Sequence, residues 1–434
     1  MRLSGRAVRG GGLHYGWIVA AITFLTLLAA AGIRATPGVL MVPLEQEFGW
    51  TRASISFAVS INLLLYGFMG PFSAALVDRL GARRTILAGM ALLAAAVGLT
   101  SLMTANWQLV LLWGIAVGAG SGMVALALAA TIVNRWFAER RGLVMGALTA
   151  STATGQLIFL PILATIIEHA GWRAAVLSIA GAGALTLPLV FFLMRDRPED
   201  IGLLPYGQQG PAAPAPRLRN PVAAAFETLG EGLRSRDFWM LATSFFICGL
   251  STNGLIGTHL IPACIDHGIP EVMAASLLAM MGVFDFFGTT ISGWLSDRWN
   301  NNWLLAWYYG LRGLSLLFLP AALNADSGVA LTAFAVFYGL DWIATVPPTL
   351  RLTANIFGKE KAGMMFGWIV AGHQVGAAVA SFGAGAIRTY LGDYFDAFMV
   401  SGTTCLAAAV LVLFIGRRLR RDGVAVPAEA ASAA

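Results

Sequence analysis

Long apolar stretches, separated by short polar segments, run along nearly the whole chain. Each stretch holds about 20 residues or more with few or no charges, which is the length an α-helix needs to cross the hydrocarbon core of a bilayer. The pattern predicts an all-α membrane protein with twelve transmembrane helices, at residues 16–43, 53–77, 84–104, 108–133, 141–168, 173–194, 239–264, 271–296, 303–322, 328–351, 362–387 and 394–416.

The longest polar segment lies between the sixth and the seventh stretch. It is rich in Pro and Gly at its start, which is typical of a linker, and residues 226–239 favour an amphipathic helix on the inner membrane surface. We therefore expect three parts: an N-terminal six-helix bundle at 1–195, a cytoplasmic linker at 196–236, and a C-terminal six-helix bundle with a cytoplasmic tail at 237–434.

Composition and charge agree with a membrane protein. The chain is 58% hydrophobic and 12% charged, with a mean hydropathy of +0.74, whereas a soluble domain carries about 25% charged residues. If both termini are cytoplasmic, the outer loops hold only Arg52, Arg173 and Arg388 of the 28 Lys and Arg residues. The positive-inside rule thus predicts this orientation, and we expect a bacterial inner membrane. The excess of Lys and Arg in the inner segments also explains the sequence pI near 9.5, so no nucleic-acid partner is implied.

The two halves carry a weak internal repeat at their inner turns. Several matches at nearly one offset indicate duplicated bundles related by a pseudo-twofold axis. Asp78-Arg79 recurs as Asp297-Arg298, and Asn134, Gly142 and Gly146 recur as Asn355, Gly363 and Gly367.

Three motifs carry a resemblance to a known family. DRLGARR at 78–84 resembles the loop between spans 2 and 3 of the major facilitator superfamily, with Ala74 where a Gly is usual. YGWIVA at 15–20 and RWFAERRGLVMG at 135–146 resemble signatures of the monocarboxylate transporters and their oxalate–formate antiporter relatives. The resemblance implies a secondary transporter of small organic anions that works by alternating access between two bundles.

Three ionisable residues are expected near the middles of neighbouring spans: Asp285, Arg312 and Asp341. An unpaired guanidinium in lipid is costly, so Arg312 should pair with one acid or both. These residues form either a proton-coupling site, with Asp285 as the titrating acid, or a buried structural ion pair. GVFDFFGTTISG at 282–293 resembles the span-8 segment of monocarboxylate transporters, in which an Arg follows the Asp by four residues; here that position is Thr289.

Arg34 is the candidate anchor for an anionic substrate. It lies in span 1, and a guanidinium offers planar, bidentate recognition of a carboxylate; alternatively its side chain extends to the outer membrane surface. The repeat places Asn253 or Gly254 at the matching position of span 7, of which Asn253 suits a hydrogen-bonding role, and it pairs His373 with Thr152. The candidate substrate-binding residues are therefore Arg34, Asn253, His373, Tyr66, Thr152 and Gln156.

The charged inner turns have a different expected role. Ion pairs between these turns and neighbouring helix ends would change with the state of the carrier, so they form a candidate conformational lock. Its members are Asp78, Arg79, Arg83, Arg84, Asp297 and Arg298.

The sequence thus predicts a monomeric carrier of a small organic anion, most simply a monocarboxylate, with protons as a candidate coupling ion and the bilayer as its environment. The alternatives are an organic-anion exchanger, an efflux carrier of amphipathic compounds and, more remotely, a ligand sensor that does not transport. No phosphate-binding loop, metal-ligand cluster or nucleophile constellation is evident in the sequence, so we expect no cofactor, no metal and no enzymatic activity.

Overall fold

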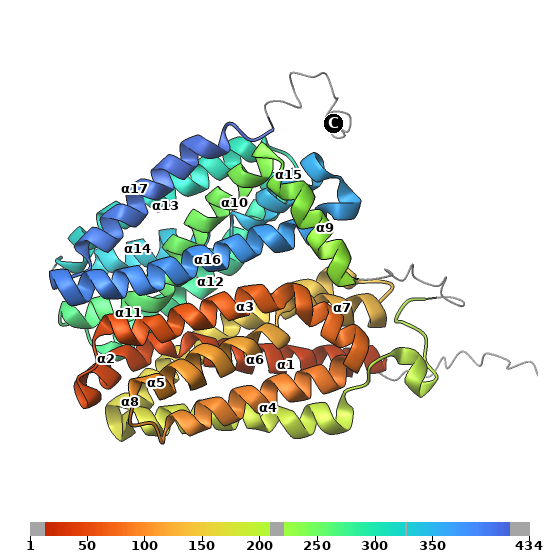
Figure 1. The fold of residues 1–434 in the computed structure, drawn as a ribbon, viewed down its shortest axis with the longest axis horizontal. Helices are drawn as coiled ribbons and strands as arrows, with labels where there is room; N and C mark the ends of the chain where they lie inside the picture. The colour runs from red at the N-terminus through yellow and green to blue at the C-terminus, as the bar shows by residue number, and fades with distance from the viewer. Residues whose placement is uncertain (1–13, 209–220, 326–327, 417–434) are drawn as a thin grey trace, which may run out of the picture.

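The computed structural model describes residues 14–208, 221–325 and 328–416, and Figure 1 shows that they fold into two groups of helices. Within these ranges the regular secondary structure is helical, apart from one isolated bridge between Phe137 and Tyr206. We call the helix ends nearest the linker the inner ends and the opposite ends the outer ends.

The first half has six membrane crossings. Pro37 begins a new helix directly after Thr36, as expected for a residue without an N–H group, so span 1 is divided in two. The helices are α1 Tyr15–Ala35, α2 Pro37–Phe48, α3 Arg52–Leu80, α4 Ala82–Thr100, α5 Asn106–Leu109, the π-helix η1 Val110–Val117, α6 Gly118–Met123, α7 Leu126–Trp136 and α8 Arg141–Leu193.

The second half repeats this arrangement, with a gap inside span 10 where the helix stops at Asp341 and resumes at Val346. Its helices are α10 Arg236–Gly249, the π-helix η3 Leu250–Ile256, α11 Gly257–Asp266, α12 Glu271–Ser296, α13 Asn301–Leu323, α14 Gly328–Asp341, α15 Val346–Phe357, α16 Lys359–Leu391 and α17 Phe395–Val412.

Eleven helical segments of the described chain are long and apolar enough to cross a membrane. One of them, α8, has 53 residues, which at 1.5 Å per residue is far longer than one crossing requires. Gly171 interrupts it with φ 80° and ψ 165°, a conformation outside the helical region. Spans 5 and 6 are therefore separate crossings joined at Gly171, and the predicted total of twelve is confirmed.

Contacts between the halves follow a pseudo-twofold axis. A β-carbon added to Gly38 on α2 would lie 3.4 Å from the carbonyl oxygen of Gly257 on α11, and these glycines occupy matching positions of the repeat. A residue that touches its own counterpart lies close to the axis. The other main contacts, α3 with α16 and α8 with α12, are equivalent under the same symmetry.

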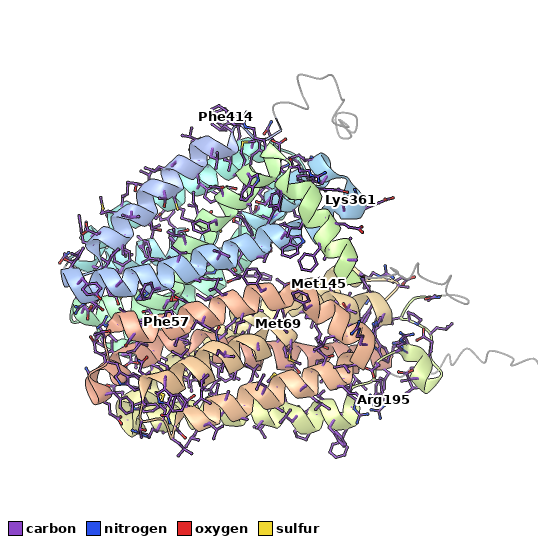
Figure 2. All side chains as sticks on the ribbon, in the orientation of Figure 1. Phe57, Met69, Met145, Arg195, Lys361 and Phe414 are labelled. Atoms are coloured by element: carbon purple, nitrogen blue, oxygen red, sulfur yellow. The ribbon has the colours of Figure 1, made fainter. Side chains whose placement is uncertain are left out.

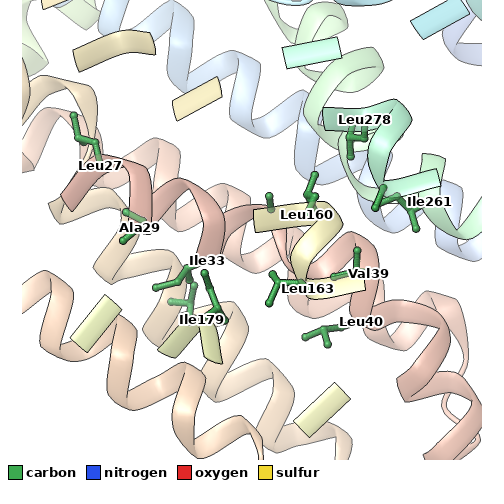
Figure 3. Packing of buried hydrophobic residues seen from close by; sticks show 14 of the residues in the cluster. Leu27, Ala29, Ile33, Val39, Leu40, Leu160, Leu163, Ile179, Ile261 and Leu278 are labelled. Carbon is green, nitrogen blue, oxygen red and sulfur yellow. The ribbon is translucent and has the colours of Figure 1, made fainter. Parts of the chain in front are cut away.

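The core continues from one half into the other near the outer ends. In Figure 3, Val39, Leu160 and Leu163 of the first half lie near Ile261 and Leu278 of the second, all within one buried cluster. Phe57 lies at the same boundary in Figure 2, with its ring 5.9 Å from that of Phe382. The helices diverge toward the inner ends (Figure 1).

The outer faces of the bundles are apolar, as a bilayer requires. On α13, exposed side chains recur every three or four residues, so one stripe of this helix faces lipid; they are Trp303, Trp307, Leu311, Leu314 and Phe318.

The linker contains a short 3-10 helix, η2 Pro198–Ile201, and an α-helix, α9 Pro221–Leu233. The helix expected at 226–239 is thus divided, because the Ser235 side chain caps α10 by accepting a hydrogen bond from the Phe238 N–H group. Next to the linker, His14 contacts the Leu204 carbonyl and the Gly416 N–H group donates to Asp237. Both described chain ends therefore lie on the linker side.

Candidate functional site

Arg34, Tyr66 and Thr152 come together in one small pocket of the first half. They reach it from α1, α3 and α8, and the remaining lining residues are Leu27, Ala30, Ala31, Ser121, Val124 and Ala125. The Arg34 guanidinium lies 4.6 Å from the centre of the Tyr66 ring, which is a cation–π contact. The pocket is therefore apolar except for one guanidinium, one phenol and two hydroxyl groups.

Close packing between α1 and α8 fixes the two sides of this pocket. A β-carbon added to Gly155 would lie 2.5 Å from the Leu28 carbonyl oxygen, and one added to Gly32 would lie 2.3 Å from the Phe159 ring. Only glycine allows the helices to approach so closely at these two positions. The approach brings Thr152, one turn before Gly155, to the pocket that Arg34 lines.

Arg34 has no counter-ion in the part of the chain that the structure describes. The side chain is half-buried, and no carboxylate among the residues that the structure describes forms an ion pair with it. A desolvated guanidinium without a partner is costly. In this state the pocket has a volume of about 10 Å³, which is room for about one water molecule, so an anion that pairs with Arg34 requires the pocket to widen.

Ser121 is a member of this pocket that sequence reasoning missed. Its side chain is 3% exposed, and its hydroxyl oxygen makes no hydrogen bond with the described chain. Buried polar atoms normally have partners, so an unpaired hydroxyl beside an unpaired guanidinium suits a bound anion. No sequence signal separates Ser121 from other small residues of its Gly-rich segment.

The other three candidates for substrate binding lie outside this pocket. Gln156 is half-buried on α8, one turn beyond Thr152, and Asn253 is half-buried on η3, one turn before Gly257. The ring of His373 packs 5.1 Å from the ring of Phe245, and its Nδ1 atom is buried without a hydrogen-bond partner in the described residues. His373 thus belongs to the second half and does not contact Arg34.

Arg312 forms a fully buried ion pair with Asp341. The Nε–H group donates to Asp341 Oδ2 at 2.6 Å, and Arg312 is 1% exposed. The remaining guanidinium nitrogens contact the Cys248 sulfur at 2.9 Å and the carbonyl oxygens of Asp341 and Trp342 at 2.5 and 3.3 Å. The expected pairing of Arg312 with a neighbouring acid is present, and the guanidinium also binds the interrupted backbone of span 10.

Asp285 and Ser292 on α12 also bind the backbone at the interruption of span 10. Asp285 Oδ1 accepts hydrogen bonds from the Ile343 N–H group at 2.9 Å and from the Thr289 hydroxyl at 2.8 Å. The Ser292 hydroxyl donates to the Ala344 carbonyl at 2.5 Å. Backbone groups released by a break in a membrane helix need such partners. Thr289, which stands where monocarboxylate transporters have an Arg, contacts Asp285 directly.

The candidate conformational lock makes contacts within each half. The Arg83 N–H group donates to Asp196 at 2.8 Å, and its guanidinium binds the Phe191 carbonyl. Asp297 forms an ion pair with Arg351, and Arg298 lies over the Trp294 ring. Arg79 and Arg84 line a separate inner pocket, and the side chain of Asp78 lies outside the part of the chain that the structure describes.

A second charged cluster, which sequence reasoning also missed, joins the two halves at their outer ends. Arg52 is 3% exposed and donates to Glu45 at 2.7 Å, to Asp266 at 2.7 and 3.1 Å, and to the Tyr394 hydroxyl at 3.0 Å. Arg388 donates to the same Asp266 at 2.7 Å. Because Arg52 and Glu45 belong to the first half and the others to the second, this outer cluster links the two halves at their outer ends.

The outer cluster continues to a buried histidine. His259 is 0% exposed; its Nε2 lies 2.7 Å from the Ser381 carbonyl, and its Nδ1 lies 3.2 Å from the Tyr394 hydroxyl. Since a carbonyl only accepts, Nε2 carries the proton, and in a neutral ring Nδ1 accepts from Tyr394. A chain of oriented hydrogen bonds therefore runs from Arg52 through Tyr394 and His259 to α16.

Replacing Arg52 with glutamine is expected to open the outer side. The substitution removes the shared cation and leaves Glu45 and part of Asp266 unpaired, which disfavours the closed state. The reporter is Val59→Cys, because Val59 is buried between the halves with Ala377 and Ala378. A membrane-impermeant maleimide should label this cysteine about tenfold faster when Arg52 is glutamine than when Arg52 is present. This corresponds to a shift of about 1.4 kcal/mol in the equilibrium between the closed and open outer side.

The matched control is Arg173→Gln. Arg173 pairs with Glu47 at the same outer surface but within one half, so its loss should leave the labelling rate unchanged. Equal rates in the Arg52 and control variants would show that the outer cluster does not hold the halves together.

Comparisons with known proteins agree with this architecture. Residues 22–381 match the family model of the Major Facilitator Superfamily. Human monocarboxylate transporter 11 is 28% identical, covering 94% of this chain and 84% of that protein. The oxalate:formate antiporter of Oxalobacter formigenes is 25% identical, covering 93% and 92%. An uncharacterized MFS-type transporter of Bacillus subtilis, YcxA, is 26% identical over 92% of both chains.

A solved structure has the same fold. A bacterial homologue of the human lysosomal transporter Spinster, in an inward-facing and unoccupied conformation, matches 95% of this chain and 99% of its own with a TM-score of 0.75 and 16% identity. With a family match over most of its length and twelve crossings around a pseudo-twofold axis, the chain belongs to the Major Facilitator Superfamily, whose members are transporters and not enzymes.

Proposed function

We propose that this transporter carries a small organic anion, most simply a monocarboxylate, by alternating access of a site that contains Arg34. The observation that carries the proposal is the unpaired, half-buried guanidinium in an otherwise apolar pocket. Relatives named as a monocarboxylate transporter and an oxalate:formate antiporter support the same class of substrate.

Each polar group of the pocket has a role in this proposal. Arg34 donates two parallel hydrogen bonds to the carboxylate, and the face of Tyr66 holds the guanidinium in place. The Ser121 hydroxyl donates to a carboxylate oxygen, because it has no other partner. The pocket has a volume of about 10 Å³ in this state, so in this proposal it widens when the substrate binds, and a short apolar body then lies against the small side chains Ala30, Ala31 and Ala125.

We also propose that transport is coupled to protons through Asp285. The buried charges of the second half comprise one cation, Arg312, and two acids, and Asp341 already neutralises that cation. Asp285 therefore adds one negative charge to a buried site, where a charge without a counter-ion is costly. A proton bound to Asp285 removes that cost, so its release and uptake can accompany the movement of the two halves.

The orientation in this proposal follows the positive-inside rule. The inner ends face the cytoplasm of a bacterial cell, the chain lies in the inner membrane, and the state described here is closed to the outside by the outer cluster. A monomer suffices, because one chain provides the whole Arg34 pocket and both bundles of the carrier.

The substrate class is tested by ligand-induced stabilisation of the purified protein. A panel of monocarboxylates, dicarboxylates and neutral analogues of equal size is added, and the melting temperature is recorded for each. The proposal expects stabilisation by at least one short carboxylate and none by its amide analogue. Equal stabilisation by the two would contradict recognition of the anionic group.

Asp285→Asn is expected to separate coupling from transport. Asparagine keeps the Oδ1 acceptor for the Ile343 N–H group and the Thr289 hydroxyl but cannot bind and release a proton. In proteoliposomes, the variant should lose uptake driven by a pH gradient while exchange of labelled for unlabelled substrate stays within about threefold of wild type, less than 1 kcal/mol.

Asp285→Ala is the companion variant, because it removes the acceptor as well and should impair both activities. If Asp285→Asn still accumulates substrate against its gradient when a pH gradient is imposed, Asp285 is not the proton site. If wild-type uptake requires internal anion and ignores the pH gradient, the protein is an exchanger, as the name of one relative suggests.

A further inference from the structure

A second pocket, separate from the Arg34 pocket, lies at the inner end of the first half. It has a volume of about 560 Å³ and is formed where α3, α4, α7, α8 and η2 meet. Among the described residues, its charged lining contains more cations than anions. The arginines are Arg79, Arg83, Arg84, Arg135 and Arg197, and the acids are Asp196 and Asp200.

The two acids are engaged with the backbone. Asp196 Oδ1 accepts a hydrogen bond from the Arg83 N–H group at 2.8 Å, at the start of α4. Asp200 Oδ2 accepts from the Arg197 N–H group at 3.0 Å. These carboxylates therefore stabilise the local fold, and neither forms an ion pair with a described arginine of the pocket.

Three guanidinium groups of the pocket have no protein partner. Within the described ranges, the side chains of Arg79, Arg84 and Arg197 make no hydrogen bond and no ion pair. The Nε atom of Arg83 is likewise buried without a partner. Like charges that share one pocket repel one another, and a bound anion with several acceptor oxygens would relieve that repulsion.

The pocket also has an apolar wall that faces the membrane. Leu80 and Phe191 line it and are 46% and 50% exposed, and the neighbouring Phe192 is 66% exposed. Because α3 and α8 end at these residues, the wall lies at the level where acyl chains meet headgroups. A ligand that carries a phosphate above an acyl chain would satisfy the arginines and the wall together, whereas free phosphate would satisfy only the arginines.

We propose that this pocket binds the phosphate group of an anionic phospholipid from the leaflet at the inner ends of the helices. Basic pockets between transmembrane helices on the cytoplasmic side suit such headgroups. The inference does not depend on the transported substrate, since it concerns a site that Arg34 does not share.

The test titrates the purified protein with phosphatidylglycerol and follows bound lipid by native mass spectrometry. The double variant Arg79→Gln, Arg84→Gln should bind it about 30-fold more weakly, since each guanidinium near an anionic lipid contributes about 1 kcal/mol. The control is Arg234→Gln, Arg298→Gln, which removes the same charge from exposed inner positions outside the pocket. It should bind like wild type.

Three outcomes overturn the proposal: equal affinity in the double variant and wild type, an equal loss in the control, or displacement of the lipid by inorganic phosphate at equal concentration. The last would assign the arginines to a soluble phosphate. If the double variant is not monodisperse, Arg84→Gln alone, at an exposed position, should weaken binding about fivefold, and wild-type affinity in that variant also overturns the proposal.

Discussion

Replacing Arg34 with alanine should weaken binding of the transported carboxylate about 100-fold and remove measurable uptake. A charge-assisted, bidentate contact contributes about 2–3 kcal/mol, and the pocket offers no second cation, since Tyr66, Ser121 and Thr152 are its other polar members. The measurement is the dissociation constant of the best ligand from the melting panel, together with its uptake into proteoliposomes.

Two further variants show whether geometry as well as charge is recognised. Arg34→Lys keeps the cation but loses the planar pair of donors, so affinity should fall about tenfold. Thr154→Ala, on α8 beside Thr152 but outside the pocket, should behave as wild type. Full activity in Arg34→Ala would remove the basis for an anionic substrate.

Replacing Arg312 with methionine should strongly destabilise the folded protein. The substitution leaves Asp341 buried without its counter-ion, for which about 3–5 kcal/mol is typical, and it frees the Asp341 and Trp342 carbonyls at the break in span 10. The expected result is a large loss of monodisperse protein and a lower melting temperature.

The double variant Arg312→Met, Asp341→Asn provides the control. It removes the unpaired charge, so it should be more stable than Arg312→Met alone, although the backbone hydrogen bonds are still lost. If both variants melt at the same temperature, the ion pair contributes little and Arg312 acts mainly through the span-10 backbone.

Most of the architecture could be predicted because the bilayer imposes it. Span lengths follow from hydrocarbon thickness, and the expected break between spans 5 and 6 falls at Gly171. The repeat in the sequence predicted related halves, and the contact between Gly38 and Gly257 is the direct consequence of that symmetry.

The sites were harder to predict because they depend on helix rotation and on distant partners. The sequence predicts Arg34, Tyr66 and Thr152 as candidates together with Asn253, His373 and Gln156, but it does not tell which of them meet in one pocket. Ser121 has no distinguishing sequence context. Arg52 was counted only as an outer-loop residue, yet its partner Asp266 lies 214 positions away. Charge patterns alone do not reveal such long-range pairs.

Span 10 illustrates the same limit. Asp285, Arg312 and Asp341 were expected at one depth, and Arg312 does pair with Asp341. The interruption after Asp341 does not follow from hydropathy, because its sequence remains apolar; the local signal for it is the pair Pro347 and Pro348 in the first turn of α15. The partners of the freed backbone groups come from α12 and α13, which no local pattern reveals.

The most direct measurement of the central claim is counterflow in proteoliposomes. Vesicles loaded with an excess of the best unlabelled carboxylate are diluted into a trace of the labelled compound, without an imposed ion gradient. A carrier that alternates around Arg34 predicts a transient accumulation of label in wild type and none in Arg34→Ala. Label that fails to accumulate in wild type, or accumulates equally in the variant, would contradict the account.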